Sequence, residues 1–171
     1  MSRFLGIDYG SKRVGLAISD KSNIIAKPYK TLINKSENDL LSQIEIIIRD
    51  NNIKLIVIGL PLNMSGKDTS QTKSVRKFKE TLHKAGLPIV FEDERLSSVS
   101  AKNSLIFQNI KTGHNKSQID KTAAAIILQQ FLYILHLYPC PTINHNYFLS
   151  MYNPEQFVLK FLFCFSLQLN I

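Results

Sequence analysis

The sequence predicts an α/β fold in which a mixed sheet, an antiparallel meander followed by parallel strands, is flanked by helices. Two observations support this prediction. Residues 3–8 and 13–19 are apolar runs joined by a short segment that contains Gly10, which is typical of a β-hairpin with a glycine turn. Two later apolar runs, 54–60 and 87–91, alternate with amphipathic segments, which is typical of parallel strands connected by helical crossovers.

The first half of the chain continues from the hairpin into a strand, a helix and a further strand. A third short strand around residues 24–30 would complete the meander. Ser36 is a favourable N-cap, and apolar residues follow it at helical spacing, so a helix is expected over residues 37–50. The run KLIVIGL, residues 54–60, is rich in β-branched residues and predicts a strand buried on both faces, which ends at Pro61.

A polar loop, a second helix and another strand are expected next. The stretch NMSGKDTSQT, residues 63–72, is polar and is expected to be flexible. The helix after it is expected to end at Gly86, and residues 87–91 predict a buried strand that leads into the charged cluster EDER, residues 92–95. The apolar positions that predict the helix are Val75, Phe78 and Leu82.

Two more helices complete the predicted fold. A third helix is expected to begin at Ser97 or Ser98 and to run to about Gln108. The basic loop NIKTGHNK, residues 109–116, then leads to a fourth helix over residues 117–137. The apolar face expected for this helix consists of Ile119, Ala123, Ile126, Ile127, Phe131 and Ile134.

Composition and charge narrow the function classes. The 171-residue chain is 44% hydrophobic and carries a formal net charge of +8, so we expect a globular protein with an anionic partner, nucleic acid ahead of a membrane surface. The cysteines and histidines show no metal-ligand spacing, which argues against a zinc site. Because there are only 2 cysteines and no pattern of a signal or transit peptide, we expect a reduced, cytoplasmic protein.

Residues 1–138 are expected to form one domain, and residues 139–171 a separate apolar C-terminal extension. Charge nearly disappears in the extension, where Glu155 and Lys160 are the charged residues. Its run FVLKFLFCFSLQLNI is 15 residues long, shorter than the roughly 20 residues of a membrane-spanning helix. The extension could pack on the domain, form an oligomer contact or lie exposed, and translation past a displaced stop codon would also give such a composition.

Acidic residues lie at the ends of elements that are otherwise apolar. Asp8 ends the first strand, and Asp93 and Glu94 end the last one. Asp120 lies in the first turn of the expected fourth helix. Because the carboxyl ends of parallel strands gather at one edge of an α/β sheet, we expect these acids to meet at that edge.

Each acid also has a purely structural explanation. Asp8 could favour the turn that follows it, since aspartate hydrogen-bonds to nearby backbone in turns. The pair at residues 93–94 could be a solvated strand end, weakly paired with Arg95. The segment from Ser117 to Asp120 resembles a capping box with aspartate in place of glutamate, so Asp120 could serve only its helix.

Converging carboxylates would require cations. Their mutual repulsion would otherwise raise at least one pKa. Ligands that offer only oxygen favour Mg²⁺ or Mn²⁺ over zinc, and two such ions about 4 Å apart can hydrolyse a phosphodiester bond. Basic side chains near this edge would bind phosphate or simply form a solvated face. They are Lys12, Arg13, Lys67, Lys73, Arg76, Lys77, Lys111 and Lys116.

Four segments of the chain resemble the signature blocks of one known family. The family is YqgF, the Holliday-junction-resolvase-like proteins that are also described as pre-16S rRNA nucleases. The blocks occur in the family's order and cover about residues 1–138. They are DYGSKRVGLAISD (8–20), GLPLNMSG (59–66), FEDERLSS (91–98) and DKTAAAIILQQFL (120–132).

This resemblance implies an RNase H-like fold and a metal-dependent endonuclease that hydrolyses phosphodiester bonds. The implied role is to process the 5′ end of pre-16S rRNA during ribosome biogenesis. By position, Asp8, Glu94 and Asp120 correspond to the catalytic acids that hold Mg²⁺ or Mn²⁺, with Asp93 as the alternate to Glu94. The residues expected to bind the substrate are Lys12, Arg13, Arg95 and Lys116.

Other functions remain open at this stage. A Holliday-junction resolvase would perform the same reaction on branched DNA, for which a two-fold symmetric dimer is the natural form; we expect a monomer or a homodimer. A noncatalytic nucleic-acid-binding protein, acting in ribosome assembly or transcription, is a second alternative. Nucleotide-dependent phosphotransfer of the actin-like type is disfavoured, because the chain lacks both the room for a second domain and a P-loop.

Overall fold

The described part of the chain contains five strands, three α-helices and one 3₁₀ helix. The structure is a computed structural model that describes residues 2–94 and 116–137. The expected third helix, nearly all of the basic loop and the C-terminal extension lie outside the described residues. No helix in the described ranges is long and apolar enough to cross a membrane. In chain order the elements are β1 (Arg3–Tyr9), β2 (Arg13–Ser19), β3 (Ala26–Ile33), α1 (Glu37–Asp50), β4 (Ile53–Leu60), α2 (Ser70–Leu82), the 3₁₀ helix η1 (His83–Ala85), β5 (Ile89–Asp93) and α4 (Lys116–Leu137).

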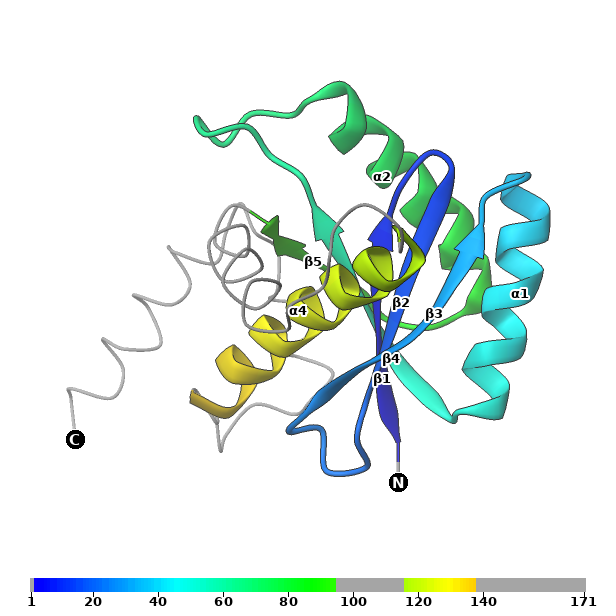
Figure 1. The fold of residues 1–171 in the computed structure, drawn as a ribbon, viewed down its shortest axis with the longest axis vertical. Coiled ribbons are helices and arrows are strands. Elements are labelled where there is room, and N and C mark those ends of the chain that lie inside the picture. The colour runs from blue at the N-terminus through cyan, green and yellow to red at the C-terminus, as the bar shows by residue number, and fades with distance from the viewer. Residues whose placement is uncertain (1, 95–115, 138–171) are drawn as a thin grey trace.

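The five strands form one mixed sheet with the order β3-β2-β1-β4-β5 (Figure 1). β1 pairs with β2, and β2 with β3, in antiparallel register, which is the predicted meander. β4 lies between β1 and β5 and is parallel to both, and α2 carries the chain back over the sheet between β4 and β5. The predicted α/β fold with a mixed sheet is confirmed.

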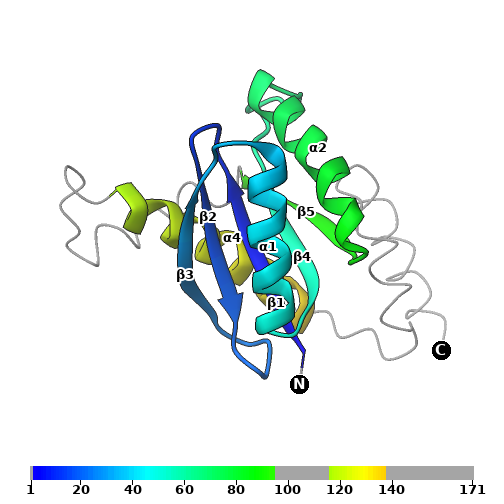
Figure 2. The same cartoon turned by 90° about the vertical axis from the view of Figure 1, so that its right-hand side faces the viewer.

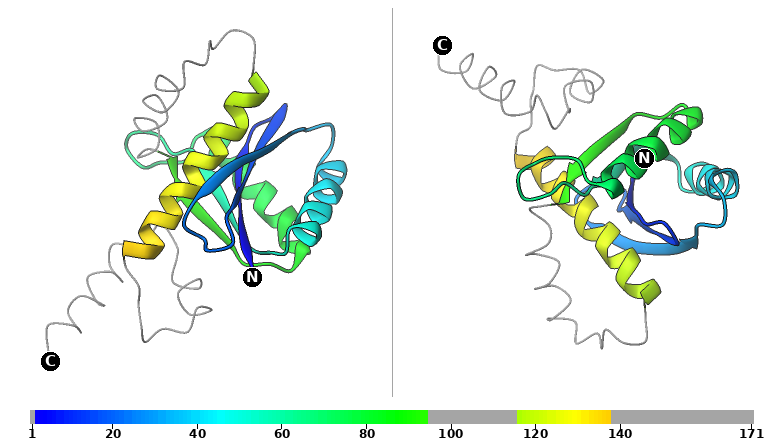
Figure 3. Two further views of the ribbon diagram at one scale, coloured as in Figure 1. Left: turned by 60° about the horizontal axis from the view of Figure 1, so that its bottom comes forward. Right: turned by 90° about the horizontal axis from the view of Figure 1, so that it is seen from above.

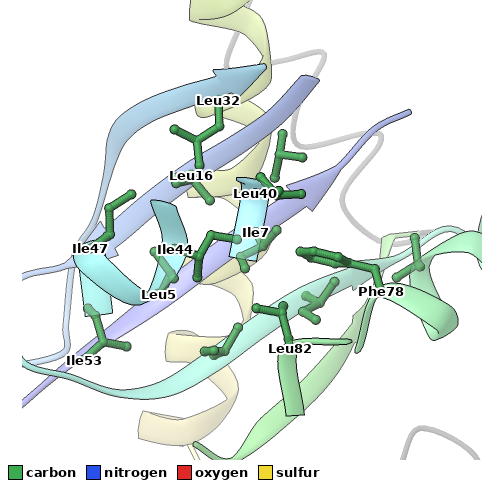
Figure 4. Close-up of a cluster of buried hydrophobic side chains, with 14 of the residues drawn as sticks. Leu5, Ile7, Leu16, Leu32, Leu40, Ile44, Ile47, Ile53, Phe78 and Leu82 are labelled. Carbon is green, nitrogen blue, oxygen red and sulfur yellow. The ribbon is translucent and has the colours of Figure 1, made fainter. Parts of the chain in front are cut away.

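Helices lie on both faces of the sheet (Figures 2 and 3). The buried hydrophobic side chains form two clusters, one on each face. α1 and α2 cover one face, where Ile7 of β1, Ile44 of α1 and Phe78 of α2 belong to one cluster of buried side chains (Figure 4). α4 covers the other face, where Phe4 of β1 packs with Leu128. Since successive residues of a strand point to opposite faces, the buried partners of a strand residue show which face it points to.

The third strand begins later than the sequence suggests. β3 starts at Ala26 and runs to Ile33, whereas a strand was expected around residues 24–30. The side chain of Asp20 accepts hydrogen bonds from the backbone N–H groups of Ile24 and Ile25, at 2.8 and 3.1 Å. These bonds hold the residues before Ala26 in a turn, because they occupy amides that a strand ladder would otherwise use.

The second helix begins earlier than its apolar positions indicate. Thr69 is the N-cap and forms a capping box with Thr72, whose hydroxyl also donates to the carbonyl of Pro61. α2 therefore starts at Ser70, and the last residues of the stretch expected to be flexible are helical. The predicted end is confirmed, since Gly86 closes the helical segment with a left-handed φ of 69°.

The predicted apolar face of the last helix is partly wrong. α4 begins one residue earlier than expected, at Lys116. Ile127 and Phe131 are buried as predicted, but Ile119, Ala123, Ile126 and Ile134 are only partly buried. The helix is apolar around most of its circumference, so periodicity alone did not identify the side that packs on the sheet. The buried residues are Thr122, Ala124, Ala125, Ile127, Leu128, Phe131 and Leu132.

A glutamine side chain joins α4 to the β2–β3 connection. The amide of Gln129 accepts a hydrogen bond from the backbone N–H of Ala26 at 2.8 Å and donates one to the carbonyl of Ile24 at 2.9 Å. These contacts satisfy backbone groups next to the start of β3, where the sheet has its edge. These hydrogen bonds hold α4 on the sheet in addition to its apolar contacts.

Candidate active site

Asp8 is the residue before the last one of β1, which runs parallel to β4. Figure 1 shows β1, β4 and β5 side by side in the sheet. Asp8 follows Ile7, which pairs with Ile58 of β4. The last pair between β4 and β5 joins Leu60 to Asp93, so the three strands end side by side. This is the edge at which ligands bind in open α/β sheets, and the sequence predicted that acids meet there.

α4 brings Asp120 to the same edge. Asp8 pairs with Gly15 across the β1–β2 hairpin, so both residues face the same side of the sheet. A Cβ atom on Gly15 would collide with the backbone of Asp120, so α4 lies directly on β2 at this point and only glycine permits the approach. Asp8 therefore points to the face that α4 covers.

Within the described residues, the structure shows neither a capping box at Asp120 nor a hydrogen bond of the Asp8 side chain in the turn after it. α4 begins at Lys116, which places Ser117 inside the helix and Asp120 beyond its first turn, so Asp120 is not part of the expected capping box. The turn after Asp8 is closed by the backbone, because the N–H of Gly10 donates to the carbonyl of Arg13 at 3.0 Å. Both side chains can therefore serve in a functional site.

Glu94 lies over the end of β4. A Cβ atom on Gly59 would collide with Oε1 of Glu94 and would lie 2.6 Å from the side chain of Ile127 in α4. The glycine therefore leaves room for the glutamate carboxylate beside α4. Glu94 points toward the same face as Asp8.

Asp93, the alternate in the sequence, has a different setting. It lies two residues after Phe91, which belongs to the core under α1 and α2. The ring of Phe91 is covered on that side by the cationic groups of Arg76 and Lys79, at 5.6 and 5.0 Å from its centroid. Since side chains two apart in a strand share a face, Asp93 is directed away from α4, whereas Glu94 is directed toward it.

Burial and repulsion raise the pKa of two of the acids. Burial raises the pKa of Asp8 from its ordinary 3.8 to about 6, and the negative charge of Asp120 adds to this effect. Burial also raises the pKa of Glu94 from its ordinary 4.5 to about 7, with smaller contributions from the charges of Asp8 and Asp93. Asp8 thus lies within electrostatic reach of both Glu94 and Asp120, so the three acids converge.

Of the basic residues predicted near this edge, some pair with acids, some are exposed and some lie outside the described residues. Arg13 does not lie free, because its Nε donates to Oδ2 of Asp120 at 2.5 Å. Lys12, in the hairpin turn, and Lys116, at the start of α4, are both exposed near this edge. Arg95 and Lys111 lie outside the described residues.

Two of the other cations pair with acids around α2. Arg76 donates to both carboxylate oxygens of Asp68, at 3.0 and 3.1 Å, and Lys77 lies 3.2 Å from Glu37 of α1. These cations are therefore already engaged with acids of the fold. Lys67 and Lys73 are exposed.

Glu92 is an acid that the sequence analysis did not single out. It is 3% exposed in β5, two residues before Glu94 and two after Val90, which packs in the core beneath α4. It therefore points to the same face as Glu94. Its spacing of two residues from Val90 indicates that it faces the same side of the sheet. The run of charges at residues 92–95 hides this, because it resembles a solvated strand end.

Carboxylate oxygens are suitable ligands for a divalent cation, although the described side chains do not surround a metal-sized site. Within residues 2–94 and 116–137, no three side chains of histidine, cysteine, aspartate or glutamate are grouped closely enough to hold a metal ion. Yet the carboxylate of Asp8 is largely buried and close to two other acids, so its ionisation is opposed by burial and repulsion that a cation would relieve. The donor set, which is oxygen only, fits Mg²⁺ or Mn²⁺.

Two solved structures of RuvC superpose on this chain and show its fold. Thermus thermophilus RuvC in complex with a Holliday junction superposes with a TM-score of 0.53 at 11% identity, covering 80% of this chain and 96% of that chain. A second structure of RuvC from the same organism gives a TM-score of 0.51 at 11% identity, over 78% of this chain and 96% of that chain. The RNase H-like fold implied by the sequence is confirmed.

Sequence comparisons identify the family. A relative from Pelagibacter ubique is 41% identical over 74% of this chain and 85% of its own length. One from Maridesulfovibrio salexigens is 42% identical over 76% and 97%, and both bear the name "Putative pre-16S rRNA nuclease". A family model described as "RuvX: Holliday junction resolvase" matches residues 2–134. The chain therefore belongs to the RuvX family, also called YqgF.

Proposed function

We propose that this protein is a nuclease that depends on Mg²⁺ or Mn²⁺ and hydrolyses phosphodiester bonds, with the 5′ end of pre-16S rRNA as its substrate. One observation carries the proposal: Asp8, Glu94 and Asp120, from three separate elements, approach one another at the edge where the parallel strands end. Membership of the RuvX family supports the reaction type. The names of the relatives at 41% and 42% identity support the RNA substrate.

The three carboxylates would hold the metal. Asp8 is coupled electrostatically to both other acids, since its charge raises the pKa of Glu94 and its own pKa is raised by the charge of Asp120. A divalent cation bound there would supply the positive charge that stabilises the phosphate and its leaving oxygen during hydrolysis. The orientation of Glu94 toward α4 favours it over Asp93 as the third ligand.

The basic residues near this edge would bind the nucleic-acid backbone. Lys12 and Lys116 are exposed on the hairpin turn and at the start of α4, and Arg13 is paired with Asp120. We assign these three side chains, together with Arg95, to phosphate contacts. Such contacts give affinity and position the strand without reading its sequence.

The remaining properties follow from this function. Since rRNA precursors are made in the bacterial cytoplasm, we place the protein there, as a monomer or a homodimer. We assign residues 1–138 to the nuclease domain and treat residues 139–171 as a separate extension, in line with a family match that ends at residue 134.

One experiment tests the proposal against its rivals. The purified protein should cleave an RNA that spans the 5′ boundary of 16S rRNA when Mg²⁺ or Mn²⁺ is present, and Asp8→Asn should abolish cleavage while RNA binding persists. A synthetic four-way DNA junction, assayed in parallel, tests the resolvase activity named in the family description. Binding of either substrate without cleavage in any metal would instead favour the noncatalytic alternative.

A further inference from the structure

Arg13 and Asp120 form an ion pair inside the candidate active site, where β2 and α4 meet. The residues are 107 positions apart in the chain, and Nε of Arg13 lies 2.5 Å from Oδ2 of Asp120. Their side chains are 34% and 20% exposed, so water screens this pair less than a pair on the open surface. Among the described residues, Arg13 is the hydrogen-bond partner of the Asp120 side chain.

Asp8 and Asp120 differ in the charged groups and hydrogen-bond donors around their carboxylates. The carboxylate of Asp8 accepts no hydrogen bond from any described residue and lies close to two other acids. Asp120 instead has an arginine, which stays protonated at every physiological pH. A divalent cation held by these carboxylates would therefore lie near the guanidinium of Arg13, which is bonded to one of its ligands. The two positive charges would repel each other.

The guanidinium of Arg13 can also reach a second partner. Its Nε is used by Asp120, while its two terminal nitrogens have no hydrogen-bond partner among the residues that the structure describes. Guanidinium groups bind phosphate oxygens through paired N–H donors, and such charge-assisted bonds are strong. The side chain thus pairs with a proposed metal ligand and still has donors that a phosphate could use.

We propose that Arg13 is the counterion of Asp120 in the substrate-free protein, and that a nucleic-acid phosphate draws its guanidinium away so that Asp120 can bind a divalent cation. Arg13 is then a positioning residue that acts through Asp120. Substrate and metal bind cooperatively as a result, because each favours the state in which the ion pair is broken. This inference rests on the proposed nuclease function, since it assumes that Asp120 is a metal ligand.

Metal binding measured without catalysis tests the inference. Isothermal titration calorimetry with Mn²⁺ would be run on the whole chain, with and without a short phosphorothioate RNA that resists hydrolysis. Arg13→Gln should bind Mn²⁺ at least about tenfold more tightly than the wild type in the absence of RNA, because the repelling charge is gone. The increase in Mn²⁺ affinity that RNA causes in the wild type should be largely lost in this variant.

Lys12→Gln is the matched control. It removes the same charge from the neighbouring position, but the Lys12 side chain is exposed and makes no ion pair with Asp120. Its Mn²⁺ affinity without RNA should stay within about twofold of the wild-type value, because water and salt screen the charge of an exposed side chain. Equal Mn²⁺ affinities in Arg13→Gln and Lys12→Gln, or weaker Mn²⁺ binding in Arg13→Gln than in the wild type, would overturn the inference.

Two further measurements separate this inference from the proposed function. If the wild type binds Mn²⁺ no better than Asp8→Asn does, the metal-dependent function fails, and the inference fails with it. If the wild type binds Mn²⁺, Asp8→Asn does not, and Arg13→Gln behaves like Lys12→Gln, only the inference fails. Thermal melting in EDTA checks that Arg13→Gln is folded, and Arg13→Met, which keeps an aliphatic side chain, replaces it if it is not.

Discussion

Gly15 lies directly beneath the backbone of Asp120, at the point where β2 meets α4. Across the hairpin, Gly15 pairs with Asp8, which faces the same side of the sheet. The approach of the two acids is therefore set by a backbone contact that only a residue without Cβ permits. This contact gives the first prediction.

Gly15→Ala should destabilise the fold and lower nuclease activity. The added methyl group meets backbone, which cannot move aside as a side chain can, so α4 must shift. Overpacking of this kind costs about 1–3 kcal/mol of unfolding free energy, which urea denaturation would measure. Ser11→Ala, in the exposed turn of the same hairpin, is the control and should change the unfolding free energy little. Equal stability of Gly15→Ala and the wild type would contradict so close a contact between β2 and α4.

Glu94→Gln and Asp93→Asn should differ in activity. Glu94 is directed toward α4 and Asp8, whereas Asp93 is directed toward the face beneath α2. We expect Glu94→Gln to reduce cleavage by at least about a hundredfold, as is usual for loss of a metal-binding or proton-transferring group, and Asp93→Asn to reduce it far less. Cleavage rates at saturating Mg²⁺ would decide between them. A larger loss in Asp93→Asn would reverse the assignment.

Without metal, the acids should make stability depend on pH. The pKa values of Asp8 and Glu94 are raised to about 6 and about 7, so the folded state holds these protons more tightly than the unfolded state. Their stabilising contribution is complete below a pH of about 4 and is lost as the pH rises through the two raised values. In EDTA, the melting temperature of Asp8→Asn should therefore exceed that of the wild type by a margin that grows from about pH 4 to about pH 7 and then levels off.

Added Mg²⁺ provides the complementary measurement. It should raise the wild-type melting temperature more at about pH 8 than at about pH 5, because a cation binds the ionised carboxylates. A margin between Asp8→Asn and the wild type that stays constant with pH would show that Asp8 has an ordinary pKa in the folded protein.

Gln129→Ala should loosen the contact between α4 and the β2–β3 connection. The substitution removes two hydrogen bonds and leaves the N–H of Ala26 and the carbonyl of Ile24 without this partner. We expect a loss of about 1–3 kcal/mol in unfolding free energy. Gln43→Ala is the matched control. Among the described residues, the Gln43 amide bonds to the exposed side chain of Asp39, and the loss of this bond should cost much less. Similar losses in both variants would refute a special role for Gln129.

Removal of the C-terminal extension should leave the nuclease domain intact. The family match ends at residue 134, and the buried residues described in the two cores lie before residue 133. A chain that ends at Tyr138 should therefore keep the melting temperature and the cleavage rate of the full protein. Loss of folding or activity on truncation would show that residues 139–171 belong to the functional unit.

Local sequence signals predicted much of the fold. The hairpin around Gly10 and the helix capped by Ser36 depend on turn and cap residues that act within a few positions, and both are present. The start of β3 was wrong because Asp20 bonds to the amides of Ile24 and Ile25, a contact that apolar patterning does not report. The packed face of α4 was partly wrong because that helix is apolar on most sides.

The candidate site was predictable in outline but not in its contacts. The acids were expected at one edge because they end elements whose directions the α/β topology fixes. The ion pair of Arg13 with Asp120 joins residues 107 positions apart, and sequence spacing carries no information about such a pair. The space that Gly15 and Gly59 leave for α4 and Glu94 likewise depends on packing between distant segments.

The placement of α4 also bears on how the protein could lose activity. This one helix supplies Asp120, covers a whole face of the sheet and holds the β2–β3 connection through Gln129. The sheet with α1 and α2 has its own core on the opposite face, so we expect this part to keep its structure longer than the contact with α4. Brief opening of a single helix would then dismantle the acid cluster at a smaller free-energy cost than global unfolding, and heat inactivation would precede the loss of the sheet.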